Sequence, residues 1–371
     1  MKKLIALLLA LAMMLSLAAC GAAADPTEAP MQTETFDQPE NQETEAPAPT
    51  TRTFTDSTGR EVTIDAQIDR IAVSGPLAQQ VLFALAPDKM IGIATEWDSS
   101  AEQYLATEYY NLPVLGQLYG GKGEMNLEEL LSAAPQIVID VGESKGAVGE
   151  DMDALQEQTG ITFVHVSATL STMGDAYRML GELLDMEEEA ERLATYCEDV
   201  YSGIIETVES VEKANLLYVT GEEGLNVIAQ GAYHGEVIDL LGNNLAVMAD
   251  PSSKGSGNEV DMEQILTWNP DVIIFSDESI YDTVGSDPMW QTVTAISTGK
   301  FYEVPAGPYN WMGFPPSVQR LLGMLWMTEL LYPEATDYDL FEEVRTFYDL
   351  FYHCELTQEQ FNALMSNSIG K

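Results

Sequence analysis

The chain has 371 residues, with 16 Lys and Arg against 60 Asp and Glu, and its formal net charge at pH 7 is −44. This charge excludes nucleic acid as a partner and opposes adhesion to anionic lipid. It favours either a basic or cationic partner or a role in solubility. The length is sufficient for two cores of ordinary domain size.

Residues 1–19 are predicted to be a signal peptide and not part of the fold. Two lysines precede an apolar run that is too short for a mature transmembrane helix. The segment L-A-A-C that ends at Cys20 resembles the lipobox of bacterial lipoproteins. This resemblance implies a lipidated Cys20 as the first mature residue. It also implies a membrane-anchored protein on the outer face of the cytoplasmic membrane, at the cell surface or in the periplasm.

Residues 20–52 are predicted to be a disordered, acidic tether. From Gly21 to Thr51 there is no Lys or Arg, and Glu, Asp, Pro and Thr recur with almost no large apolar residue. Such a segment cannot bury enough surface to offset its ordering entropy. We therefore expect it to hold the folded part of the chain away from the membrane.

Residues 53–185 are expected to form a first α/β lobe. A hairpin is predicted over 54–64, because the turn residues D-S-T-G lie between its two halves. Strand and helix patterns then alternate, which favours a parallel sheet. The predicted strands are 71–73, 90–93, a strand ending at 139, and 162–166, and predicted helices include 77–86 and 151–159.

An internal repeat relates this lobe to the second half of the chain. The segment 124–139 and the segment 259–274 share Glu, Glu and Pro at a constant offset of 135 positions (259 − 124). In each copy an N-cap residue opens a short helix, a proline ends it, and an apolar run typical of a buried strand follows. The matched positions are Glu124, Glu128 and Pro135, and Glu259, Glu263 and Pro270.

A long helix is predicted over 186–212, because apolar residues keep helical spacing there while glutamates take the other positions. It is long enough to connect two lobes as a rigid strut. Residues 213–371 are expected to repeat the α/β plan. The strands predicted in this second lobe are 216–219, 245–248, 272–275 and 301–304, and the helices are 316–331, 338–351 and 357–364.

Cysteines, histidines and motifs do not indicate catalysis. Cys197 falls on an apolar helical stripe and is interpreted as a core residue, while a disulfide between Cys197 and Cys354 is left open. The three histidines share no close spacing, so a three-histidine metal site is not expected. No nucleophile, phosphate-loop, zinc or dinucleotide motif occurs in the right context, and no Ser/His/Asp order is expected. We therefore predict a protein that is not an enzyme and has no cofactor.

Together these features resemble the solute-binding lipoproteins of ABC importers. The resemblance rests on the lipobox, the acidic linker, the D-S-T-G-R-E-V hairpin, the repeated unit, the long helix, and G-P-Y-N-W ahead of P-P-S-V-Q-R-L-L. It covers the chain from Cys20 onward and points to the helical-backbone class that serves ferric siderophores, haem and cobalamin. It implies two Rossmann-like lobes with parallel sheets joined by one long rigid helix. It also implies a monomer that works with an ABC permease dimer and its ATPase.

In that family an acidic residue on each lobe docks into arginine pockets of the two permease subunits. The matching positions here are Glu128 and Glu263, with Glu124 and Glu259 as weaker candidates. Glutamate in a first helical turn is also favoured by the helix dipole alone. That effect does not explain matched placement on two lobes, so permease docking is the preferred interpretation.

The ligand is expected in the cleft between the lobes, walled by loops at the carboxyl ends of the strands. Aromatic residues in polar or glycine-containing loops are the preferred wall residues, because large planar or catecholate ligands stack on them. The candidate ligand-binding residues are Trp97, Tyr119, Lys122, Tyr233, His234, Tyr309 and Trp311.

Three ligand classes follow from the resemblance. A ferric siderophore is the first expectation, although the few basic cleft candidates, Lys122, Lys145 and Lys254, weaken a highly anionic one. Haem is an alternative, because His234 beside Tyr233 could supply an axial ligand, and a cobalamin-like corrinoid is another. A different class of function is a surface sensor or adhesion lipoprotein without transport.

Overall fold

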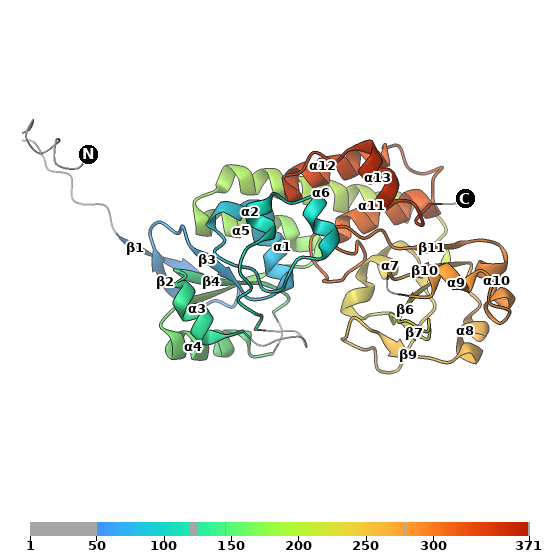
Figure 1. Ribbon diagram of the computed structural model, residues 1–371, viewed down its shortest axis with the longest axis horizontal. Coiled ribbons are helices and arrows are strands. Elements are labelled where there is room, and N and C mark those ends of the chain that lie inside the picture. Colours follow the sequence, from blue (N-terminus) through green and yellow to red (C-terminus); the bar gives the residue numbers. More distant parts are fainter. Residues whose placement is uncertain (1–49, 119–124, 145, 278, 370–371) are drawn as a thin grey trace, which may run out of the picture. The chain divides into compact units, whose positions relative to one another are not determined.

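Two parallel β-sheets, one in each half of the chain, form the framework of the fold (Figure 1). The computed structural model describes residues 50–118, 125–144, 146–277 and 279–369. Pro49–Lys371 forms one compact unit. The predicted signal peptide, Cys20 and nearly all of the tether lie outside the described residues.

The first lobe contains a three-stranded sheet of β3 (Ile71–Val73), β4 (Ile137–Gly142) and β5 (Thr162–Ser167), in the order β3-β4-β5. Both pairings are parallel. Every residue of β3 and β4 is buried, which is why these strands read as continuous apolar runs. The helices of this lobe are α1 (Pro76–Leu85), α2 (Thr107–Tyr110), α3 (Leu127–Ala133), α4 (Val148–Thr159) and α5 (Met173–Leu184).

The second lobe repeats this plan with β6 (Asn215–Thr220), β10 (Val272–Phe275) and β11 (Phe301–Glu303), all paired in parallel. A short antiparallel edge, β7 (Asn226–Val227) and β9 (Asn258–Glu259), extends the sheet in the order β11-β10-β6-β7-β9. The parallel pair of β6 with β8 (Asn243–Asn244) lies off this path. The predicted α/β class with parallel sheets in two lobes is thus confirmed.

The remaining helices cover the second lobe and return over the first. They are α7 (Glu236–Leu241), α8 (Met262–Trp268), α9 (Tyr281–Val284), α10 (Thr294–Ser297), α11 (Arg320–Leu331), α12 (Leu340–Tyr352) and α13 (Gln358–Leu364). Helix α12 packs on α1 of the first lobe and on α11 of the second.

The long helix α6 (Glu187–Glu209) contacts α1 and α5 on one side of the chain and α7 and α11 on the other. Figure 1 shows it in the layer of helices that extends over the strands of both lobes. Its buried residues follow helical spacing and include Cys197, which is a free thiol 1% exposed. Cys354 is also free, so the two cysteines do not pair.

Two predicted strands are absent from the described structure. At 90–93 only isolated bridges form, from Met90 to Ile71 and from Ile93 to Val114. At 245–248 the chain turns directly after β8, because the N–H of Val247 bonds to the carbonyl of Leu245, and Val247 is 68% exposed. Helix α5 was not predicted at all.

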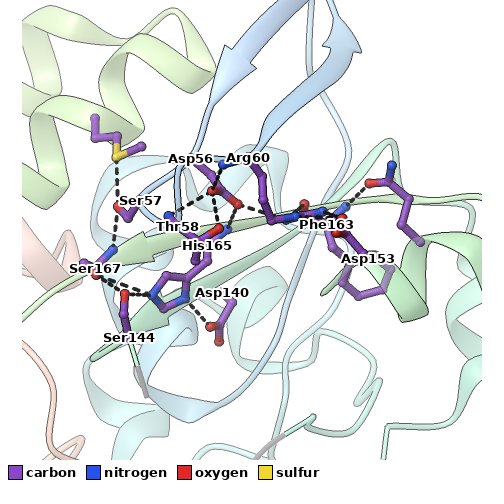
Figure 2. Close-up of polar contacts among 12 residues, drawn as sticks. Asp56, Ser57, Thr58, Arg60, Asp140, Ser144, Asp153, Phe163, His165 and Ser167 are labelled. Carbon is purple, nitrogen blue, oxygen red and sulfur yellow. Dashed lines mark hydrogen bonds and ion pairs between the residues drawn. The ribbon is translucent and has the colours of Figure 1, made fainter. Parts of the chain in front are cut away.

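The predicted hairpin forms from β1 (Thr51–Thr55) and β2 (Glu61–Asp65) and is fastened to β5 through the buried carboxylate of Asp56 (Figure 2). Asp56 Oδ1 accepts hydrogen bonds from Thr58 Oγ1 at 2.6 Å and from the N–H of Arg60 at 3.1 Å. Its Oδ2 accepts from Arg60 Nη1 at 2.9 Å and from the N–H of His165 at 3.3 Å. The D-S-T-G-R segment is therefore both a turn and an anchor.

We predict that Gly181→Ala destabilises the α5/α6 contact. A Cβ at Gly181 would lie 2.5 Å from the Cβ of Ala190 and 3.2 Å from the Cα of Glu187, so the helices would have to separate. Overpacking of this kind costs about 1–3 kcal/mol. Urea unfolding should show this loss of stability.

The matched control is Gly203→Ala within α6, where an added Cβ meets nothing within 4 Å. Because alanine favours helix over glycine, this variant should gain about 0.8 kcal/mol. Equal stability of the two variants would contradict the proposed close approach.

A second prediction concerns Asp56. Burial raises its pKa, but the hydrogen bonds from Thr58, Arg60 and His165 outweigh it, and the pKa lies below the ordinary value of 3.8. The stabilisation is therefore complete above the unfolded pKa, and it is lost as the pH falls through the folded pKa. Asp56→Asn should cost about 2 kcal/mol at pH 7.

The difference between wild type and Asp56→Asn should shrink as urea unfolding is repeated at pH values below about 4. Asp153→Asn, which removes an Arg60 partner whose side chain is 68% exposed, should cost less than about 1 kcal/mol. A loss at pH 3 as large as that at pH 7 would show that the charge of Asp56 is not the cause.

Candidate functional site

A cavity of about 1010 Å³ lies at the carboxyl ends of β6, β10 and β11. Asp98 and Ser100 of the first lobe complete its wall. This is the place expected for a ligand in an α/β fold, because loops that leave the strand ends converge there. The other lining residues are Thr220, Gly221, Glu222, His234, Ser253, Lys254, Gly255, Ser256, Ser276, Asp277, Ala306, Gly307, Pro308, Tyr309, Asn310 and Phe314.

A second cavity, of about 320 Å³, lies at the carboxyl ends of β3 and β4 and is also lined by Tyr233 of the second lobe. Its other walls are residues 74–78, 140–143, Val148 and Asp151. Residues of both lobes therefore contribute to both cavities, as the cleft prediction requires.

The structure separates the predicted ligand residues into three groups. Tyr309 and His234 line the larger cavity, and Tyr233 lines the smaller one. Trp97 and Trp311 are only 5% and 0% exposed, so neither side chain can touch a ligand in this conformation. At these two positions the tryptophan side chains pack in the core and do not line the wall of a cavity. Tyr119 and Lys122 lie outside the described residues.

Trp97 still contributes to the site from behind, because its ring packs against that of Tyr309 with centroids 5.6 Å apart. Gln79 Nε2 of α1 donates a hydrogen bond to Tyr309 Oη at 3.0 Å. Burial raises the pKa of Tyr309, so this phenol is neutral. Tyr309 thus presents a fixed aromatic side chain that is held by the opposite lobe.

His234 is oriented on the cavity wall by contacts that include a hydrogen bond and a stacked ring. Its Nδ1 lies 2.7 Å from the carbonyl oxygen of Gly313, to which it donates, so in the neutral ring Nε2 carries the lone pair. Its ring is stacked on Phe314, with centroids 5.2 Å apart. The imidazole is therefore a rigid, planar element of the wall.

Carboxylates dominate the charge of the larger cavity. Asp98, Glu222 and Asp277 line it, whereas Lys254 is the one lysine on the described wall and no arginine lines it. The backbone N–H of Ser100 lowers the pKa of Asp98, which therefore stays ionised at neutral pH. Asp277 Oδ1 accepts a hydrogen bond from Asn310 Nδ2 at 2.7 Å, which fixes it in place. The cavity suits a cationic or neutral ligand better than an anionic one.

A buried arginine that the sequence analysis missed lies behind Tyr233. Arg320 of α11 is 0% exposed, and its Nη1 lies 2.6 Å from Glu236 Oε2. Its guanidinium lies 5.0 Å from the centroid of the Tyr233 ring. The signal was present in the sequence, because a single arginine in the apolar run S-V-Q-R-L-L-G-M-L-W indicates a buried charge that needs a partner.

This ion pair holds the guanidinium of Arg320 against Tyr233, which lines the smaller cavity. Burial raises the pKa of Tyr233 and of Glu236, and the charge of Arg320 opposes both shifts. Without a ligand, Tyr233 is therefore a neutral phenol at neutral pH.

Ser144, His165 and Asp140 form a hydrogen-bonded line, an arrangement that the sequence analysis did not expect (Figure 2). His165 Nδ1 lies 2.6 Å from Asp140 Oδ2, and Ser144 Oγ lies 2.9 Å from His165 Nε2. The sequence alone does not show this arrangement, because Asp140 and His165 become neighbours only through the parallel pairing of β4 with β5.

This network supports the wall of the smaller cavity. The hydroxyl of Ser74 donates to the second oxygen of Asp140, and both residues line that cavity. His165 is fully buried, and Ser167 Oγ lies 2.5 Å from Ser144 Oγ. A buried polar network with its partners in place rigidifies the segment that carries it.

The two repeated helices present Glu128 and Glu263 on the surface. Both residues are exposed and lie in the first turn of α3 and α8. Asn126 and Asp261 cap these helices with their side chains, as the sequence predicted. Glu259 is exposed at the end of β9, and Glu124 lies outside the described residues.

Two kinds of feature are absent from the described part of the chain. No group of three or more His, Cys, Asp or Glu side chains among those residues is placed to hold a metal ion. No helix among them is sufficiently long and apolar to span a bilayer.

Comparison with known proteins gives three findings. The chain is 24% identical over 328 residues to the molybdate-binding protein MolA of Haemophilus influenzae, covering 81% of this chain and 91% of MolA. It is 23% identical over 188 residues to the Fe(3+)-citrate-binding protein YfmC of Bacillus subtilis, covering 50% and 58% of the two chains. The crystallised ABC transporter solute binding protein of Sulfurospirillum deleyianum matches with a TM-score of 0.78 and 28% identity, covering 85% of this chain and 99% of that one.

The model of the periplasmic binding protein family matches residues 71–308, which span most of both lobes. That match fits the two parallel sheets, the helix α6 that contacts both lobes, and the cavities at the strand ends. The chain therefore belongs to the periplasmic binding protein family, the non-enzymatic solute-binding components of ABC importers.

Proposed function

We propose that this protein captures an iron chelate, a neutral or cationic ferric siderophore, and delivers it to a membrane permease. The observation that carries the proposal is the larger cavity. About 1010 Å³ is room for a chelate of many atoms, and its wall combines the aromatic rings of Tyr309, His234 and Phe314 with three carboxylates. Aromatic walls suit large, partly planar ligands.

The wall charge argues against small oxyanions as the ligand. MolA is named for molybdate and YfmC for ferric citrate, and both of these ligands are anionic. An anion in the larger cavity of this chain would face Asp98, Glu222 and Asp277, and among the described wall residues Lys254 is the one lysine or arginine side chain to balance them. We therefore place this chain among importers of neutral or cationic chelates.

Haem remains a second candidate because His234 lies on the cavity wall. Its Nδ1 donates a hydrogen bond to the carbonyl oxygen of Gly313, so an axial bond to iron would form at Nε2. Tyr233 supports haem less well, since burial raises its pKa. A corrinoid, which needs no axial residue from the protein, is compatible with the same aromatic wall.

Delivery is proposed to use Glu128 and Glu263 as contacts to two arginine-containing pockets of the permease dimer. A Glu–Arg contact is charge-assisted and directional, so it fixes register and can be released when the transporter changes state. The proposal is supported by the same first-turn position of both residues on exposed helices.

The predicted lipid anchor completes the proposal. The lipobox ending at Cys20 would hold the protein at the outer face of the cytoplasmic membrane, and the acidic tether of residues 20–52 would let the lobes reach the permease. A sensor or adhesion lipoprotein would need no matched docking residues, so the docking test below separates the two classes.

Ligand titration tests the capture step. The Cys20→Ser chain, expressed without residues 1–19, should bind a neutral ferric hydroxamate with a Kd of about 1 μM or lower in calorimetry. Molybdate and ferric citrate should bind much more weakly. Tyr309→Ala should weaken chelate binding at least about tenfold, because it removes an aromatic contact.

The matched control is Tyr110→Ala, a tyrosine that lines neither cavity. Tighter binding of molybdate than of any chelate would overturn the ligand proposal. A Soret shift with haemin that disappears in His234→Ala would favour the haem alternative.

Docking is tested by transport. Glu128→Ala with Glu263→Ala should abolish chelate uptake in cells while leaving chelate affinity in solution unchanged, because neither residue lines a cavity. Glu129→Ala is the control, since it lies on the same exposed helix but has Gln264 at the repeated position. Unchanged uptake in the double variant would contradict the importer proposal.

A further inference from the structure

Two exposed leucines occupy equivalent positions in the internal repeat. Leu131 is 47% exposed and Leu266 is 38% exposed, and they are separated by the repeat offset of 135 positions (266 − 131). Within the described part of the chain, only six large hydrophobic side chains are this exposed. Single surface leucines need no explanation, but two at matched positions share a cause.

The helices that carry these leucines are built alike. Both have a capping side chain before the first turn, a fully buried residue at Leu130 or Ile265, and a left-handed residue after the last turn. Both have the same sequence of exposed, half-buried and buried positions at every residue but one. The two leucines are therefore presented to solvent in the same way.

Each leucine lies three residues after the proposed docking glutamate, Leu131 after Glu128 and Leu266 after Glu263. Residues three apart on a helix are neighbours on one face. Each lobe thus carries the same surface pair, a carboxylate beside an apolar side chain. We call these two pairs the docking pairs.

We propose that Leu131 and Leu266 are apolar anchors for the permease, each filling a hydrophobic socket beside the basic group that receives the neighbouring glutamate. The inference rests on the proposed function. It adds that the permease surface combines an arginine with an apolar recess at two equivalent places, one for each subunit.

The number of docking pairs and the net charge of the chain indicate which partner binds them. Two matched pairs on one chain fit a partner with two equivalent subunits, whereas a symmetric dimer of this chain would need only one self-complementary patch. A lipid surface is disfavoured because the chain carries a net charge of −44 and a carboxylate accompanies each leucine. At protein interfaces, an apolar side chain that is buried in a recess often contributes much of the binding free energy.

The test measures binding to the permease–ATPase complex whose ATPase rate the wild-type protein raises, reconstituted in nanodiscs. Leu131→Gln and Leu266→Gln should each weaken binding about tenfold, and the double variant about a hundredfold. Chelate affinity should not change, because neither leucine lines the cavities, and thermal unfolding should change only slightly, because each side chain is partly exposed. If the substitutions to Gln disturb folding, the double variant Leu131→Ser with Leu266→Ser provides a second test.

The matched control is Val247→Gln with Met289→Gln, two exposed apolar residues outside the repeated helices, 68% and 58% exposed. This variant should bind within about twofold of wild type. Equal binding of the leucine variant and this control would overturn the inference.

Two further arms separate the remaining outcomes. If Glu128→Ala with Glu263→Ala weakens binding but the leucine variants do not, the apolar anchors are wrong and the docking proposal stands. If neither weakens binding, the docking proposal itself fails. Loss of binding by the leucine variants to protein-free vesicles of anionic phospholipid, with permease binding unchanged, would assign the leucines to lipid and overturn the inference.

Discussion

The packing of α6 against helices of both lobes is the constraint on which the rest of the structure depends. Gly181 lets α5 approach so closely that an added Cβ would lie 2.5 Å from Ala190. A helix packed along its length resists bending, since bending breaks consecutive backbone hydrogen bonds. We therefore propose that the cleft between the strand ends is largely formed before a ligand arrives and that capture requires only modest closure. The hydrogen bond from Gln79 to Tyr309 links the lobes again at the cleft.

Two separate surfaces of the protein are proposed to select the ligand and the membrane partner. The larger cavity is lined by the carboxylates of Asp98, Glu222 and Asp277 and by aromatic side chains, and we propose that the carboxylates select against anions. On α3 and α8, exposed glutamates and leucines face solvent at matched positions. A rigid frame keeps these helices at a fixed separation, which a two-subunit partner can recognise. Ligand selection and partner selection can thus change independently.

Much of the fold could be predicted from the sequence because buried parallel strands and capped helices leave local signals. Ile71–Val73 and Val272–Phe275 form strands as predicted. The strand expected at 245–248 is absent because the chain turns directly after β8, where the N–H of Val247 bonds to the carbonyl of Leu245. The site was harder to predict, since exposure depends on distant segments: Trp97 and Trp311 were expected on the wall and are buried. The line of Ser144, His165 and Asp140 depends on the pairing of β4 with β5, whereas Arg320 left a signal in the sequence as the single arginine of an apolar run.

The most direct test of this account is a crystal structure of the protein with a bound neutral ferric hydroxamate, with the iron located by its anomalous scattering. The account predicts one strong iron peak inside the larger cavity, between Tyr309 of the second lobe and Asp98 of the first. It also predicts an α6 that stays straight. An iron peak outside this cavity, or a bound state in which α6 is broken to let the lobes rotate, would contradict it.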